Sequence, residues 1–351
     1  MLDFADLRKV VKQEGLAMMT SKQLRFLFRA GLLVGACAVT GCGGTKDSAT
    51  QSFDMSEYRK LMERQKGEQA ALGDPTPSTP EMTPEEHERA GDMDAQRRNF
   101  FLAGVHYGKA LNADPTRNSA RLKLGQIFLQ QGMLEPALTQ FQDLQAREPD
   151  SAPAHQRIGH VYLFQGKLLE AETALTKAIA LNPSNWVAHN LLGLIYEQSQ
   201  RYAEAITAYK AALALRPREP GVLNNLGLAY ALSGDHEAAI KAYEQASATG
   251  SATPKLYNNL GVAYAHGRRY ADALEAFKKA TDEPRAYNNL GVALLGMGQP
   301  TLAVACFEKA IELNPQYYEK ASDNLRQARQ ALANSTNGAS ASGPTKNVSC
   351  P

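Results

Sequence analysis

The sequence lacks the features that most enzymes and nucleic-acid-binding proteins show. Its 38 lysine and arginine residues nearly balance 36 aspartate and glutamate residues, so nucleic acid is not expected as a partner. Aromatic residues make up only 7%, which together with abundant alanine and leucine favours helices over sheet. HExxH, Walker and GxSxG motifs are all absent. We therefore expect no enzymatic activity, no cofactor and no metal site.

Long hydrophobic runs are also missing. The most apolar stretch, AGLLVGACAV at residues 30–39, is too short for a membrane span and follows several basic residues, as in a targeting segment. It ends in VTGC, which resembles a bacterial lipobox. The resemblance implies a signal peptide over residues 1–41 and a lipidated N-terminus at Cys42. An ordinary signal peptide or a short anchor is the alternative.

The leader is long and its first residues include acids, so we expect the true start at Met18 or Met19. Gly43 follows the lipobox cysteine, and by resemblance to enterobacterial sorting this favours the outer membrane over the inner one. The expected location is therefore the outer membrane, with the protein facing the periplasm. Residues 42–83 are polar and contain prolines that oppose a helix, which predicts a flexible proline-rich tether spanning roughly 35 Å.

Four cysteines are present, and no pair has zinc-ligand spacing. Cys37 would leave with the leader, and Cys42 would carry the lipid. A disulfide between Cys306 and Cys350 is possible in an oxidising periplasm. However, Cys306 lies among apolar helix residues and Cys350 in a polar tail, so this pairing is not favoured.

A repeat occupies most of the remaining chain. Glycines recur at intervals of 34, 34, 34, 34 and 30 residues, and alanine follows each glycine by twelve residues. A large residue comes four positions after that alanine, and most units close on proline. The glycines are Gly125, Gly159, Gly193, Gly227, Gly261 and Gly291, and the large residues are Phe141, Leu175, Tyr209, Tyr243, Phe277 and Phe307.

This pattern resembles the tetratricopeptide repeat, in which each unit is two antiparallel helices, A and B. The resemblance implies an all-α, right-handed superhelical solenoid of about seven helix-turn-helix units over residues 84–316. The first unit is degenerate, with Asp94 where a tyrosine is expected. A capping helix at residues 317–334 and a disordered tail at residues 335–351 should complete the chain.

The sixth unit is four residues short. Six residues separate Ala280 from Tyr287, whereas ten separate Ala246 from Tyr257. Its second helix, or the loop that follows, should lose about one turn, and the superhelix should change pitch there.

In this family helix A lines a concave groove. We number each unit so that its conserved glycine is eighth. The fifth position then supplies Asn190, Asn224, Asn258 and Asn288, the sixth Asn225, Asn259 and Asn289, and the ninth Leu228, Val262 and Val292. Asparagine amides match the donor and acceptor of a peptide group, so these residues could hold an extended backbone. Alternatively, the sixth-position asparagines could simply bond a neighbouring helix.

Together these features predict a lipid-anchored scaffold that binds partner proteins or extended peptides in its groove. Similar lipoproteins assist assembly of pili and secretion systems. A docking adaptor for periplasmic cell-wall hydrolases or proteases is the first alternative. A regulatory component of a polysaccharide or glycosyltransferase system is the second, although no catalytic domain accompanies the repeats.

Overall fold

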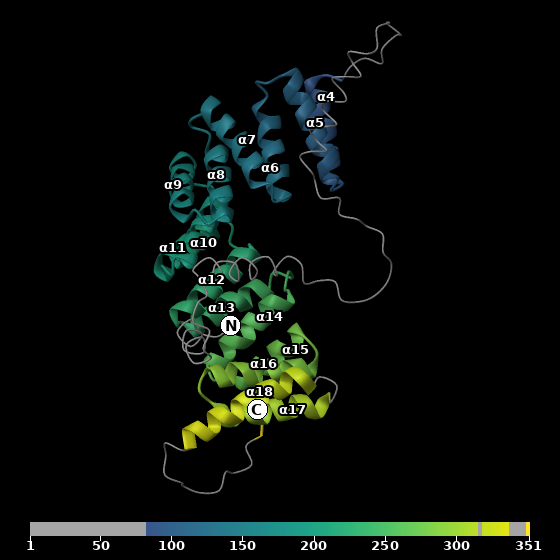
Figure 1. The fold of residues 1–351 in the computed structure, drawn as a ribbon. Coiled ribbons are helices and arrows are strands. Elements are labelled where there is room, and N and C mark those ends of the chain that lie inside the picture. Colours follow the sequence, from purple (N-terminus) through teal and green to yellow (C-terminus); the bar gives the residue numbers. More distant parts are fainter. Residues whose placement is uncertain (1–81, 315–317, 337–348) are drawn as a thin grey trace, which may run out of the picture.

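The computed structural model describes residues 82–314, 318–336 and 349–351. Cys42, the leader and residues 42–81 of the expected tether lie outside these ranges, as do residues 337–348 of the tail. Within the described ranges the chain forms fifteen helices and no strand. The helices stack as successive pairs into a long curved solenoid, from α4 at one end to α18 at the other (Figure 1). The predicted all-α repeat fold is confirmed.

Seven antiparallel pairs precede the final helix. The first helices of the pairs, the A helices, are α4 Pro84–Gln96, α6 Asn118–Gln130, α8 Ala152–Gln165, α10 Trp186–Gln198, α12 Pro220–Ser233, α14 Pro254–His266 and α16 Glu283–Gly296. The second helices, the B helices, are α5 Phe100–Ala113, α7 Leu134–Arg147, α9 Leu168–Leu181, α11 Tyr202–Leu215, α13 His236–Ser247, α15 Tyr270–Ala280 and α17 Pro300–Leu313. In Figure 1, α9 and α11 lie on the outer edge of the curve and α8 and α10 on its inner side.

The recurring glycine of the first helix and the large residue of the second, aromatic in all pairs but α8–α9, hold each pair together. A Cβ atom added to Gly193 would lie 2.3 Å from Cε1 of Tyr209, and one added to Gly291 would lie 2.6 Å from Cε1 of Phe307. Both rings are fully buried. The two helices can therefore approach closely only where the first carries no side chain.

Helix ends follow the local chemistry. α11 stops at Leu215, two residues before Pro217, because the residue before a proline disfavours helical geometry. Thr253 caps α14 by accepting a hydrogen bond from the Leu256 amide at 3.3 Å, and Asp282 caps α16 in the same way.

The sixth unit shows where its four residues are lost. Helix α15 has 11 residues, whereas α11 has 14, and only Thr281 and Asp282 connect it to α16. Both the helix and the connector are therefore shorter, and α16 begins one residue earlier relative to its glycine. α14 packs directly on α16 more extensively than other successive A helices pack on each other.

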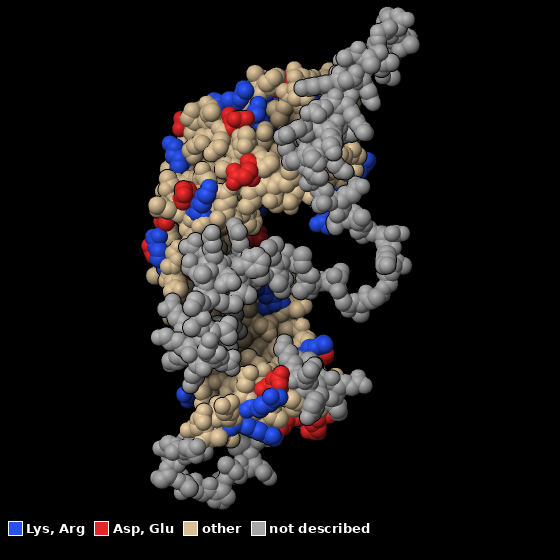
Figure 2. All heavy atoms as spheres, viewed as in Figure 1, with Lys and Arg blue, Asp and Glu red and all other residues tan. Residues whose placement is uncertain are grey.

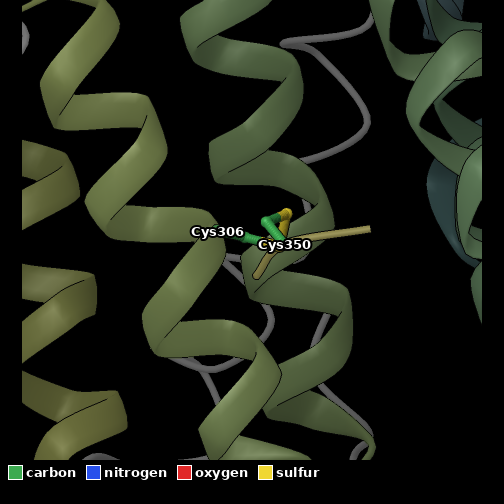
Figure 3. Close-up of a disulfide and its surroundings, with 2 residues drawn as sticks. All are labelled: Cys306 and Cys350. Carbon is green, nitrogen blue, oxygen red and sulfur yellow. A yellow bond between two sulfur atoms is a disulfide. The ribbon is translucent and has the colours of Figure 1, made fainter. Parts of the chain in front are cut away.

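The final helix, α18 Tyr318–Thr336, packs on α17 and buries Ala321 and Ala328. Cys306 on α17 is bonded to Cys350, 44 residues later (Figure 3). The argument against this pairing is therefore wrong. Cys306 is fully buried, and Cys350 packs against the same cluster of apolar residues, so the end of the chain returns to α17.

Candidate peptide-binding groove

The predicted groove is the face formed by the A helices, and we define it by their fifth, sixth, ninth and twelfth positions. Helices α10, α12, α14 and α16 supply its C-terminal part, which carries all the asparagines singled out above. In Figure 2 the visible wall of the hollow below the middle of the molecule is mostly free of charge, whereas charged side chains gather along the outer edge.

The asparagines form a ladder in which each rung joins two successive units. The amide nitrogen of a sixth-position asparagine donates to the side-chain oxygen of the fifth-position asparagine in the unit before it. The rungs are Asn225 to Asn190 at 3.3 Å, Asn259 to Asn224 at 3.3 Å and Asn289 to Asn258 at 3.2 Å. A fourth rung extends the ladder into the cap, from Asn324 on α18 to Asn288 at 2.9 Å.

This ladder explains why the phrase Asn-Asn-Leu-Gly recurs. One asparagine of each pair bonds the preceding unit and the other bonds the following unit, so a doubled asparagine continues the ladder in both directions. The sixth-position residues thus bond a neighbouring helix, as the alternative expectation had it, and they do so through its asparagine side chains. The asparagines therefore help to join the units.

The same amides keep hydrogen-bonding capacity. A fifth-position residue such as Asn224 or Asn258 uses only its oxygen in the ladder, so both hydrogens of its amide nitrogen remain unpaired among the described residues. Both residues are half-buried and border the groove. Asn288 is 3% exposed and lies deeper. The ladder can thus donate to a bound backbone without breaking its own rungs.

Aliphatic side chains lie beside the ladder. Leu228 and Val262, at the ninth position, are half-buried, and Val292 is 38% exposed. Leu232 on α12, four residues after Leu228, is 46% exposed. Exposed aliphatic groups next to free amide donors are what an extended segment with apolar side chains requires.

One ionisable group interrupts this lining. Glu197 occupies the twelfth position of α10, is half-buried, and accepts a hydrogen bond from the Tyr209 hydroxyl at 3.2 Å. Burial raises the pKa of the Glu197 carboxyl to about 7, against the opposing effects of the Tyr209 bond and the charge of Lys255.

The N-terminal part of the same face has different chemistry. Arg157 on α8 donates to the Gln126 side chain at 3.3 Å, and the His160 ring stacks on Phe164 with centroids 4.8 Å apart. Burial lowers the pKa of His160 to about 4, with a further contribution from Arg157. Phe164 is 55% exposed. Aromatic and cationic groups therefore replace the amide ladder here.

Sequence reasoning missed two parts of this surface. Asn324 escaped notice because the cap has no repeat glycine that would place it in register. Glu197 was not singled out, since its hydrogen bond comes from Tyr209 on another helix. The tyrosines Tyr209 and Tyr243, where the other units from α6 onward have phenylalanine or leucine, could have indicated a polar partner nearby.

Comparison with known families supports the repeat fold. A family model described as the Cilia and flagella-associated protein 70 C-terminal domain matches residues 47–286, more than half of the chain. A model of the Tetratricopeptide repeat matches residues 284–317. By the first match, the chain belongs to the tetratricopeptide-repeat family of that C-terminal domain. No curated protein matches the sequence.

Solved tetratricopeptide-repeat structures resemble the chain in fold. The Cut9–Hcn1 hetero-tetramer of the APC/C aligns with a TM-score of 0.51 at 20% identity, covering 72% of this chain and 49% of that one. Pseudomonas aeruginosa pilF aligns with a TM-score of 0.50 at 20% identity, covering 61% and 91%. MamA aligns at 28% identity with a TM-score of 0.41, covering 47% and 91%.

Residues 82–314, 318–336 and 349–351 provide neither a membrane-spanning helix nor a cluster of metal ligands. None of their helices combines the length and hydropathy needed to cross a bilayer. The same residues contain no group of three or more histidine, cysteine, aspartate or glutamate side chains placed to bind a metal ion.

Proposed function

We propose that this protein is a scaffold that holds an extended segment of a partner protein along the amide ladder of its groove. The observation that carries this is the pairing of unused amide donors, as on Asn224 and Asn258, with exposed aliphatic side chains such as Val292. A ladder that served only to join units would not need an apolar and accessible border.

The scaffold is further proposed to be anchored through Cys42 in the outer membrane, facing the periplasm, where it assists assembly of a pilus or secretion system. The disulfide between Cys306 and Cys350 supports an oxidising compartment, because such bonds rarely persist in the cytosol. Mass spectrometry of the mature N-terminus should find an acylated Cys42. An intact leader on the mature protein would contradict the anchor.

Site-specific photo-crosslinking in the cell envelope tests the groove. A crosslinker at Val262 should capture a discrete partner, whereas one at Leu169, which is 74% exposed on the B helix α9, should not. The variant Asn258→Asp keeps the oxygen that accepts from Asn289 but loses the free donors, so it should reduce capture at Val262 with little effect on melting.

The variant Asn112→Asp makes the same change of charge at an exposed site near the end of α5 and serves as the control. It should leave capture unchanged. Equal capture from Val262 and Leu169, or capture unaffected by Asn258→Asp, would show that the segment does not bind along the ladder.

A further inference from the structure

Glu197 stands where the other C-terminal units carry apolar side chains. The twelfth position holds Leu163 in α8, Ala231 in α12, Ala265 in α14 and Leu295 in α16. Only α10 places a carboxylate there, half-buried at the middle of the solenoid. Glu197 is therefore the one departure from the apolar residues at this position.

Two tyrosines lie behind this carboxylate. Tyr209 on α11 donates its hydroxyl to Glu197. Burial raises the pKa of Tyr243 on α13, and the Glu197 charge raises it further. Both rings are almost fully buried, and the other units from α6 onward have phenylalanine or leucine at this repeat position. Tyr209 thus bonds Glu197 directly, and Tyr243 lies within range of its charge.

The protein itself leaves the Glu197 charge largely uncompensated. Within the described chain, its only hydrogen bond is the one from Tyr209, and no basic side chain forms an ion pair with it. Lys255 on α14 acts on it only at longer range and is exposed. Burying a carboxylate beside a single neutral donor is costly, and a group retained despite this cost is a candidate for binding a cation.

We propose that Glu197, which accepts the hydroxyl of Tyr209, binds the lysine or arginine side chain of the segment held in the groove. This rests on the proposed function and specifies its ligand. Leu194, one turn before Glu197 on α10, and Leu228 on α12 occupy the ninth position of the same groove. They can cover the methylene groups of a long basic side chain while its charged end reaches the carboxylate. The bound segment is therefore mainly apolar with one basic residue near its centre.

A random peptide library displayed on phage and selected on the full-length protein tests this ligand class. Selected peptides should share one lysine or arginine with aliphatic neighbours. Binding of a selected peptide should weaken at least about tenfold in Glu197→Gln, which keeps the shape of the side chain and its bond from Tyr209. Replacing the basic residue of the peptide by norleucine should weaken binding equally in the native protein and have no further effect in Glu197→Gln.

Two further variants sharpen the result. Glu170→Gln, an exposed site on α9, removes the same charge and should leave binding unchanged. Lys255→Gln removes a competing cation and should strengthen binding of the basic peptide.

Selected peptides without a shared basic residue, or equal binding to Glu197→Gln, would overturn the cation site. Peptides that then still depend on Asn258 would leave the groove intact as the binding surface. Failure to select any groove-dependent peptide would overturn both proposals.

The pH dependence provides an independent readout. Glu197 must be ionised to bind a cation, and its pKa of about 7 means that the ionised fraction rises as pH increases. Affinity for the basic peptide should therefore increase about tenfold between about pH 6 and about pH 8, and the norleucine peptide should show no such change. Burial holds the pKa of both neighbouring tyrosines far above this range, so they stay protonated. A flat pH profile for the basic peptide would contradict the assignment.

Discussion

The two ends of the solenoid build the same rung from different chemistry. At the N-terminal end the fifth position of α4 is Glu88 and the sixth position of α6 is Lys123, and they form an ion pair of 2.8 Å. In the C-terminal units the corresponding positions hold asparagines that bond at 2.9–3.3 Å. A bridge at these positions can therefore be ionic or made of amides, and the described junctions on either side of α8 have none, because Leu122 and Leu191 occupy one of the two positions.

The choice of bridge decides what the surface can still do. Glu88 also binds Arg117 at 2.9 Å, so its two oxygens are both engaged within the protein. An asparagine such as Asn258 engages only one of its polar atoms in the ladder. The ionic end is thus closed by its own partners, whereas the amide end keeps donors for a ligand. An asparagine that bridges two units can therefore also donate to the proposed ligand.

The C-terminal end of the solenoid is also closed by a disulfide, and removing it should have the largest effect on stability. The variant Cys350→Ser removes a covalent link that closes a loop of more than forty residues around the cap. Such a link typically contributes about 2–4 kcal/mol. Hydrogen exchange should accelerate in α17 and α18 and stay unchanged in α4 and α5, because each unit contacts only its neighbours. Faster exchange along the whole chain would show that the solenoid unfolds as one unit.

A second, smaller effect should mark the ionic end. Glu88→Gln leaves Arg117 and Lys123 without their shared carboxylate and should destabilise the first two units by about 1–3 kcal/mol at low salt. Raising the salt concentration should narrow the difference from the native protein, since these groups are partly exposed and therefore screened. Local stability can be followed by hydrogen exchange of α4 to α6. A difference that does not depend on salt would contradict an ionic bridge.

The smallest effect is expected at the amide end. Asn259→Ala removes one neutral rung and should cost about 0.5–1.5 kcal/mol, with no dependence on salt. The measurement is the same hydrogen exchange, applied to α12 and α14. If the loss were larger than that of Glu88→Gln, the amide ladder and not the ionic end would be the stronger joint.

Sequence alone predicted the repeat, the helix pairs and the shortened sixth unit, because glycine and alanine must recur wherever two helices touch closely. It also singled out Asn224 and Asn258, but not the partners of their side chains. Those partners belong to neighbouring units, and the rotation between units is not contained in the pattern of any single one. The bond between Cys306 and Cys350 was missed for a related reason, since the path of a returning tail leaves no periodic signal.

The shortened sixth unit leaves the rungs of the asparagine ladder nearly unchanged in length. Asn289 and Asn258 are 31 residues apart, the other two rungs between A helices span 35, and yet all three have nearly the same length. The missing residues are lost entirely from the second helix and its connector, away from the ladder. The rungs are therefore set by how neighbouring A helices pack, and not by the length of the chain between them. The face formed by the A helices thus keeps its hydrogen bonds, whereas the B helix and its connector accommodate the deletion.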